Sequence, residues 1–381
     1  MGMTERYKMV TLEDNEDITS ESYDRACDIG ATLRRIYSAL PRGEPEGLAI
    51  NDTVTPPEQW RDCSNNPGYT EESQERIFSS SYDFVNRLRW NAAFTGYSLA
   101  NVLNGNQNGG WTDQIARDFT NQELEDVPDW SVLAYPRLIE GLPDDLICRP
   151  PARFGEVGWL VDGGIVNRDT IAYQERLYLM HQFGIIDLLR GLDLNGPVRI
   201  IEIGGGYGGL AYFLGQIFKN IHYVICDLPV SLYFSATYLS EVIGPEDVVI
   251  YDGNNPEVLE SDKGPRYVCL PNHFIDHLAG QSFDLAINTM SFIEMPGDVV
   301  DHYAKGLKSL LLPEGMLFEQ NYFFLRSDAP PTYCEPRTII EKYFRYKLGI
   351  DRRSYWGIPN LWVNHLPVEL MAASKIPFHK S

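Results

Sequence analysis

Short apolar runs alternate with helical patterns in the C-terminal half of the chain. Directly after the run that ends at Ile203, apolar residues recur at the spacing of one helix face, at Leu210, Phe213, Leu214, Ile217 and Phe218. This alternation predicts a Rossmann-like, doubly wound α/β sheet. The predicted strands are 199–203, 222–226, 266–270, 283–288 and part of 311–323. An extended piece at 248–251 has no assigned place, and 336–381 has room for one helix and two more strands.

The first 150 residues have a different pattern and predict a mainly helical region with long connections. Apolar residues step by three and four in two stretches, 20–40 and 71–91, and a shorter helix is expected at 129–140. Residues 41–69 and 104–110 are rich in turn-forming residues and predict loops. We therefore expect an accessory region at 1–150, serving as a lid or a dimerisation arm, and a sheet domain at 151–381.

The segment from 153 to 179 connects these regions. Its glycines are interspersed with apolar residues, which predicts a tight hairpin. Asp169 is a candidate N-cap for a following helix that runs to about Arg190. The hairpin and helix either close over a ligand at the sheet or merely join the two regions.

Composition excludes several classes of partner and cofactor. The formal net charge is −21 at pH 7, which argues against nucleic acid and anionic membranes as partners. The six cysteines are scattered without a C-x-x-C pair, so neither a disulfide framework nor a zinc site is expected. The N-terminus lacks an apolar signal segment, and no apolar run approaches membrane-spanning length. We therefore expect a cytoplasmic protein.

The strongest motif is the glycine-rich sequence GGGYGG that follows the first predicted strand. It fits G-x-G-x-x-G through Gly204, Gly206 and Gly209, and E-x-G-x-G-x-G through Glu202 and Gly208. The glycines let a backbone loop approach a ligand closely. Asp227 ends the second predicted strand about twenty residues later, where a carboxylate can bind both hydroxyls of a ribose.

These features alone fit a nicotinamide dinucleotide or S-adenosylmethionine. Glu202 favours the latter, because a carboxylate behind the loop suits a methionine amine better than a pyrophosphate. A dehydrogenase stays as an alternative, since Tyr343 and Lys347 have Tyr-x-x-x-Lys spacing. Both residues, however, fall in a predicted last helix.

A family resemblance adds to this interpretation. IIEIGGGYGGLA, CDLP, FDLAINTMSFIEM and LLPEGMLFEQ resemble the class I S-adenosylmethionine-dependent methyltransferases. The combination of GEVGWLVDGG, YQER, EIGGGYGG and SFIEM resembles the sugar O-methyltransferases of bacterial glycan and natural-product pathways. The resemblance covers roughly residues 150 to 370. It implies a seven-stranded methyltransferase sheet, S-adenosylmethionine as cofactor and a sugar or glycosylated small molecule as acceptor.

The resemblance also implies roles for individual residues, with Glu202 bracing the loop near the methionine amine. Arg176 is a candidate partner for the cofactor carboxylate or a substrate acid, or else a member of a structural salt bridge. Gly204, Gly206 and the backbone near Tyr207 are expected beside the methionine part of the cofactor, Asp227 at the ribose, Leu228, Pro271 and Asn272 around the adenine, and Asn288 with Thr289 below the sulfonium.

Methylation of a hydroxyl calls for a general base, because the hydroxyl has a high pKa. Glu294, just after the fourth strand, is the first candidate, although it could instead cap the next helix. His273 is the second candidate and His365 the third. His273, Asp276 and His277 could also ligate a metal, but a solvated turn is favoured and no metal is expected.

The sequence thus predicts an S-adenosylmethionine-dependent O-methyltransferase of a sugar or glycoside. N-methylation of an amine or guanidine, a dehydrogenase and a scaffold without chemistry are the alternatives. The expected partner is a small molecule, and a homo-oligomer is an open option.

Overall fold

The structure, a computed structural model, describes residues 8–39, 71–91, 130–260, 266–278, 282–321, 335–349 and 358–365, with 264, 280, 370 and 374. The predicted loops at 41–69 and 104–110 lie outside these residues. The chain forms two compact units, residues 1–31 with 61–178 and residues 32–60 with 179–381. The division into domains at residue 150 stays a prediction. Among the described residues, no helix combines the length and apolar character needed to cross a membrane.

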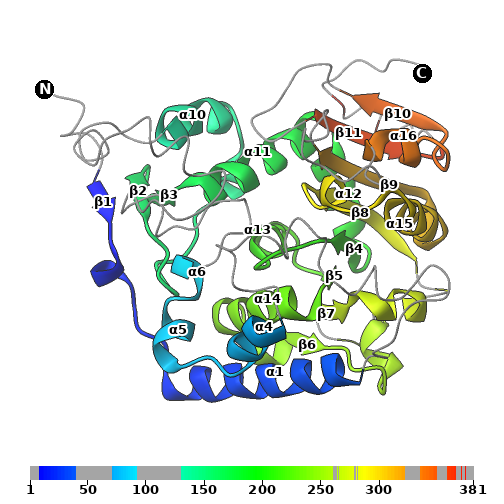
Figure 1. Cartoon of the computed structure of the whole chain (residues 1–381). Helices are drawn as coiled ribbons and strands as arrows, with labels where there is room; N and C mark the ends of the chain where they lie inside the picture. Colours follow the sequence, from blue (N-terminus) through cyan, green and yellow to red (C-terminus); the bar gives the residue numbers. More distant parts are fainter. Residues whose placement is uncertain are drawn as a thin grey trace, which may run out of the picture. The chain divides into compact units, whose positions relative to one another are not determined.

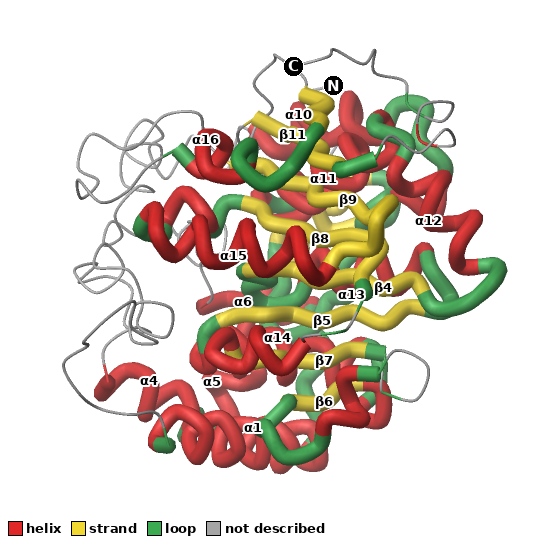
Figure 2. The backbone as a smooth tube through the Cα atoms, turned by 90° about the vertical axis from the view of Figure 1, so that its right-hand side faces the viewer, coloured by secondary structure: helices red, strands yellow, loops and turns green. Residues whose placement is uncertain are grey.

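The second unit contains an eight-stranded sheet with the order β10-β11-β9-β8-β4-β5-β7-β6 (Figure 2). All neighbouring pairs are parallel except those made by β11, which is antiparallel to β9 and to β10. The predicted strands are all present, and the extended piece without an assigned place is the edge strand β6. The sheet thus has eight strands rather than the seven that the resemblance implied. The bounds are β4 Val198–Ile203, β5 Ile221–Asp227, β6 Val248–Ile250, β7 Tyr267–Pro271, β8 Phe283–Thr289, β9 Leu311–Asn321, β10 Tyr346–Gly349 and β11 Ile358–Val363.

Helices cover both faces of this sheet, as the doubly wound prediction requires. Ile201 and Ile203 of β4 share a buried cluster with Val300 and Tyr303 of α15. The opposite face receives α13 and α14, and Ser235 of α14 lies against Cys269 of β7. Figure 1 shows α13 and α14 on one side of the strands and α15 on the other. The helices of this unit are α12 Ile185–Asp193, α13 Gly209–Ile217, α14 Pro229–Val242, α15 Gly297–Leu310 and α16 Pro336–Ile340.

The strand order reverses between β4 and β8. On one side of β4 the sheet continues with β5, β7 and β6, and on the other side with β8, β9, β11 and β10. In open α/β sheets a ligand binds at the carboxyl ends of the strands at such a reversal, because the two flanking loops diverge there. The fold therefore places the candidate site after Ile203 and Thr289, the ends of these two strands.

The first unit is mainly helical, with a small sheet of order β1-β2-β3. The predicted hairpin is confirmed as the antiparallel pair of β2 and β3. The bounds are β1 Lys8–Val10, α4 Glu71–Phe78, α5 Tyr82–Asn86, α6 Leu88–Asn91, α10 Trp130–Ile139, β2 Gly158–Val161 and β3 Gly164–Val166, with α1 Ser20–Ser38 and α11 Arg168–Gln182 crossing the boundary between the units.

Two predicted helices are interrupted. The stretch 71–91 breaks between α4 and α5, where the hydroxyls of Ser79 and Ser80 bond to the carbonyls of Glu75 and Ile77. Ser81 then caps α5 by accepting a bond from the Phe84 amide. Serine side chains compete with the helical ladder in this way and favour a new helix start.

The predicted helix from Asp169 to Arg190 is likewise two helices. Gly184 adopts φ +81°, a left-handed conformation that ends α11 before α12 begins. The cap of α11 was also wrongly predicted, because Asn167 rather than Asp169 accepts the Thr170 amide.

Asp169 instead belongs to a buried charge cluster in the first unit. The Arg89 guanidinium lies 2.8 Å from Glu156 and 2.6 Å from Asp169, and each side chain is at most 1% exposed. Asn167 donates a further bond of 2.6 Å to Glu156. Burial raises the pKa of Glu156, and the arginine opposes that shift. The cluster fixes the hairpin and α11 to the helix that carries Arg89.

Candidate functional site

The glycine loop turns sharply at the end of β4. Gly204, Gly206 and Gly208 have φ of +79°, +57° and +85°, values that residues with a Cβ rarely adopt. A Cβ on Gly204 would also collide with the Ser291 side chain. The loop therefore needs glycine both for its conformation and for its close approach to the segment after β8.

Asp227, at the end of β5, is bonded to this loop. Its carboxylate accepts hydrogen bonds from the amides of Gly206, at 3.1 Å, and Leu228, at 2.7 Å. Burial nevertheless raises the pKa of Asp227 to about 6. Gly204, Gly206, Asp227 and Leu228 are partly exposed, whereas Gly205 and Tyr207 between them are buried. The exposed residues form the accessible face of the loop.

The buried side chains of Glu202 and Tyr207 support the loop from the side opposite its accessible face. Glu202 is 1% exposed and accepts a 2.8 Å hydrogen bond from the Tyr223 hydroxyl. A Cβ on Gly205 would lie only 2.9 Å from the Glu202 carboxylate, so that carboxylate supports the loop directly. The Tyr207 ring packs edge-on against Tyr238 of α14, which leaves only the Tyr207 backbone for the loop surface.

Residues at the end of β8 form hydrogen bonds with the start of the glycine loop, across the strand reversal. Asn288 donates a hydrogen bond of 3.0 Å to the Ile203 carbonyl, and the Ser291 hydroxyl donates one of 3.1 Å to the same oxygen. Met290 between them has φ +67°, uncommon for a residue with a side chain. Such strain is found at functional sites, where the surrounding contacts hold it in place. Thr289 is 5% exposed at the same turn.

Pro271 and Asn272 lie at the end of β7. Pro271 is the register partner of Asp227, so both residues lie at the same edge of the sheet. Asn272 is 3% exposed, and its Oδ1 has no hydrogen-bond partner among the described residues. A buried amide oxygen without a partner is costly unless a ligand or water bonds to it.

The base candidates differ in their surroundings. Glu294 ends the short helix η8 (Phe292–Glu294) after β8, and it does not cap α15, which has Pro296 as its N-cap residue and no side-chain cap bond. Burial, followed by the nearby His277, lowers the pKa of His273 to about 4. His273 is thus neutral at pH 7 but a weak base. His365 is exposed beyond β11.

The metal alternative has no geometric support in the described part of the chain. His277 bonds through Nδ1 to the Tyr251 hydroxyl at 2.8 Å, and Asp276 is exposed. No group of three or more potential metal ligands occurs among the described residues.

Arg176 belongs to the first unit and is 5% exposed. Its guanidinium carbon lies 5.0 Å from the centre of the Tyr173 ring, and its Nε has no hydrogen-bond partner among the described residues. The structural salt bridge considered from the sequence is not formed within those residues. A buried guanidinium without an anion is unfavourable, so this surrounding suits an anionic group.

The Tyr343 and Lys347 pair is not a dehydrogenase site. The predicted last helix is wrong at this point, because α16 ends at Ile340 and Lys347 lies in β10. The Tyr343 hydroxyl donates a 2.6 Å bond to Asp301, while Lys347 lies over the Trp362 ring. Tyr343 and Lys347 are therefore not one helical turn apart, and their side chains are not brought together.

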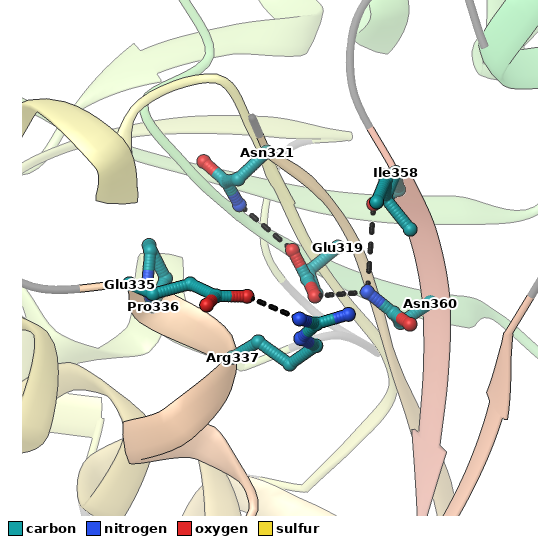
Figure 3. A pocket seen from close by; sticks show the side chains of 7 residues that line it. All are labelled: Glu319, Asn321, Glu335, Pro336, Arg337, Ile358 and Asn360. Carbon is teal, nitrogen blue, oxygen red and sulfur yellow. Dashed lines mark hydrogen bonds and ion pairs between the residues drawn. The ribbon is translucent and has the colours of Figure 1, made fainter. Parts of the chain in front are cut away.

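Sequence reasoning missed Glu319 of β9, which lies in a pocket with Asn321, Glu335, Pro336, Arg337, Ile358 and Asn360 (Figure 3). Glu319 is 1% exposed. Burial raises its pKa to about 6, although hydrogen bonds from neighbouring amides oppose that shift. A glutamate within the apolar run MLFEQ was the available signal, because such a run predicts a strand that is buried on both faces.

Comparisons with known proteins return only distant likenesses. No protein-family model matches the chain, and no curated protein sequence matches it. Among solved structures, mitomycin 7-O-methyltransferase is similar over 90% of this chain and 96% of its own, with 12% identity and a TM-score of 0.33.

Two further structures are similar over about half of this chain. Magnesium protoporphyrin IX methyltransferase from Synechocystis PCC 6803 has 15% identity, coverage of 50% and 81%, and a TM-score of 0.29. Human methyltransferase-like protein 13 has 17% identity, coverage of 52% and 88%, and a TM-score of 0.34. Scores this low do not establish a relationship, so the fold class rests on the strand order of this protein itself.

Proposed function

We propose that this protein is a class I S-adenosylmethionine-dependent methyltransferase that methylates a hydroxyl of a sugar or glycosylated small molecule. The observation that carries the proposal is the glycine loop at the strand reversal, with Asp227 bonded to Gly206 in front and the buried carboxylate of Glu202 behind. An acidic residue directly behind the loop disfavours a pyrophosphate, which needs a positive helix end free of nearby anions.

The residues present fit such a cofactor. The backbone of Gly204 and Gly206 is partly exposed, and we assign this face of the loop to the methionine part. We assign Asp227 to the ribose hydroxyls, because its carboxylate ends β5 beside the glycine loop and is partly exposed there. The unpartnered Oδ1 of Asn272 suits the adenine amine, with Leu228 and Pro271 beside the ring.

The cofactor would supply an electrophilic methyl group, and side chains of the protein would carry out the other steps. The acceptor must be aligned and its hydroxyl proton removed. We propose Glu294 as the general base, because it follows the end of β8 and does not serve as a helix cap. His273 is the second candidate, weakened by its low pKa. Asn288 is proposed below the sulfonium, and Arg176 as a partner for a carboxylate.

A thermal-shift panel tests the cofactor class. We expect S-adenosylmethionine and S-adenosylhomocysteine to raise the melting temperature, whereas NAD and NADP leave it unchanged. A ligand at 100 times its dissociation constant stabilises the folded state by about 2.7 kcal/mol. Stabilisation by the nicotinamide dinucleotides alone would overturn the proposal. No response to any of the four compounds would favour a scaffold protein.

Glu294→Gln tests the base and the nature of the acceptor atom. If the acceptor is a hydroxyl, loss of the base should lower kcat by roughly 10² to 10⁴, with the affinity for S-adenosylhomocysteine unchanged. Methyl transfer from labelled cofactor and calorimetry measure the two quantities. Undiminished kcat would favour N-methylation, since a neutral amine needs less base assistance. The cytoplasmic location and a homo-oligomer stay predictions.

A further inference from the structure

One row of cross-strand partners changes from apolar to polar side chains at the strand reversal. In register across the sheet lie Leu270, Cys226, Ile203, Asn288, Glu319 and Asn360. The members on β7, β5 and β4 are apolar, whereas those on β8, β9 and β11 are an amide, a carboxylate and an amide. All three polar side chains are at most 3% exposed. Because burying a carboxylate costs free energy that an apolar residue would avoid, this half of the row needs an explanation.

Hydrogen bonds connect the polar half of the row to the glycine loop. Asn288, which bonds to the Ile203 carbonyl, accepts a 3.0 Å bond from Asn321. Asn321 also donates to Glu319 at 2.9 Å, and Asn360 donates to the other Glu319 oxygen at 2.6 Å. Neighbouring strands lie about 4.8 Å apart, so β9 is about 10 Å from β4. Glu319 is therefore within the reach of a small acceptor that meets the cofactor over β4 and β8.

A small pocket with about 10 Å³ of free space lies against this network. The strands supply Glu319, Asn321 and Asn360, and α16 with its N-cap supplies Arg337 and Glu335 from the facing side (Figure 3). Arg337 and Glu335 form an ion pair of 2.6 Å, each 24% exposed. This space has room for about one water-sized group, so it suits a single hydroxyl of a ligand rather than a whole ring.

The polar groups of the pocket select the ligand class. Two carboxylates and one guanidinium leave a net charge of −1, which disfavours an anionic group. An apolar group would form no hydrogen bond with the carboxylates, guanidinium and amides that line the pocket. A hydroxyl both donates and accepts, and so matches carboxylates and amides together. Asn321 and Asn360 bond to Glu319, and a hydrogen bond from the Trp362 side chain also lowers the pKa of Glu319. A carboxylate offers about four lone-pair sites, which leaves one for a ligand.

We infer that this pocket is the subsite for a hydroxylated part of the acceptor, and that the Glu319 carboxylate accepts a hydrogen bond from an acceptor hydroxyl. The inference, which rests on the proposed methyltransferase function, assigns to Glu319 the selection of the acceptor rather than the binding of the cofactor. Asn321 and Asn360 act as positioning residues, because their amides hold the carboxylate from both sides.

The test is a calorimetric titration of the full-length protein with methyl glycosides of gluco, galacto, manno and rhamno configuration, with S-adenosylhomocysteine saturating. At least one glycoside should bind to the wild-type protein. Glu319→Gln should weaken that binding roughly 10- to 100-fold, the size of one charge-assisted hydrogen bond. Glu335→Gln, at the rim, should weaken it less. Glu341→Gln, an exposed glutamate just after α16, is the matched control and should leave it unchanged.

The possible results distinguish failure of the acceptor subsite from failure of the proposed methyltransferase function. An unchanged affinity for S-adenosylhomocysteine in Glu319→Gln verifies that the variant is folded and that only the acceptor subsite is altered. Binding of glycosides that is insensitive to Glu319→Gln overturns the subsite, as does the absence of glycoside binding by protein that binds S-adenosylhomocysteine. Glu319-dependent binding of ethylamine, which has no hydroxyl, instead of glycosides overturns the hydroxyl class. Failure of the wild-type protein to bind S-adenosylhomocysteine overturns the proposed function itself.

Discussion

Replacing Asp227 with alanine should nearly abolish binding of S-adenosylhomocysteine. The proposed contact is a pair of hydrogen bonds from the ribose hydroxyls to one carboxylate, and a bond to a charged group contributes about 1.5–3 kcal/mol. Two such bonds correspond to about 3–6 kcal/mol, or roughly a 10²- to 10⁴-fold weaker dissociation constant. The substitution also frees the amides of Gly206 and Leu228, which now bond to the carboxylate. Calorimetry on folded protein measures the effect.

The pKa of Asp227 provides a second readout. Because burial raises that pKa to about 6, the carboxylate should gain a proton as the pH falls from 7 to 5. A protonated acid has lost its charge and part of its acceptor capacity, so it accepts the two hydroxyl bonds more weakly and the affinity should decrease in that interval. Asp227→Asn should bind weakly without this pH dependence. Asp187→Ala, at an exposed position of α12, should stay within about twofold of the wild type. Wild-type affinity in Asp227→Ala would rule out the ribose assignment.

Arg89→Leu should destabilise the protein by about 3–5 kcal/mol, the usual cost of removing one partner from a buried ion pair. The effect is large because Glu156 and Asp169 would both stay buried without their cation, at most 1% exposed. Urea denaturation followed by circular dichroism measures the change in the free energy of unfolding.

Two controls separate charge from lost volume. Neutralising the carboxylates in Arg89→Leu with Glu156→Gln and Asp169→Asn should recover part of the loss, since no buried charge then lacks a partner. Arg25→Leu removes an exposed pair with Glu21 at 3.4 Å and should cost less than about 1 kcal/mol. An Arg89→Leu variant as stable as Arg25→Leu would show that the cluster contributes little to folding.

The sequence predicts well those elements whose conformation is determined by residues close together in the chain. The strand that ends at Ile203, the glycine turn and the helix that follows are encoded within about twenty consecutive residues, and Asp227 is expected at the next strand end. Such patterns reflect burial of one face and the conformational freedom of glycine, which act locally. The interruptions at Ser79–Ser81 and Gly184 were missed, because one side-chain bond or one left-handed residue outweighs an otherwise helical pattern.

The glycine loop, Asp227 and the doubly wound sheet therefore follow from the sequence by itself, together with the class of cofactor that they favour. Only the tertiary structure showed that β6 is an edge strand and that Glu319 meets Asn360, 41 residues away, beside a pocket. It also brought Arg89 to Glu156 and Asp169, separated by 67 and 80 residues. A buried charge gives no periodic signal, since its partners are set by strand order and helix packing rather than by spacing along the chain.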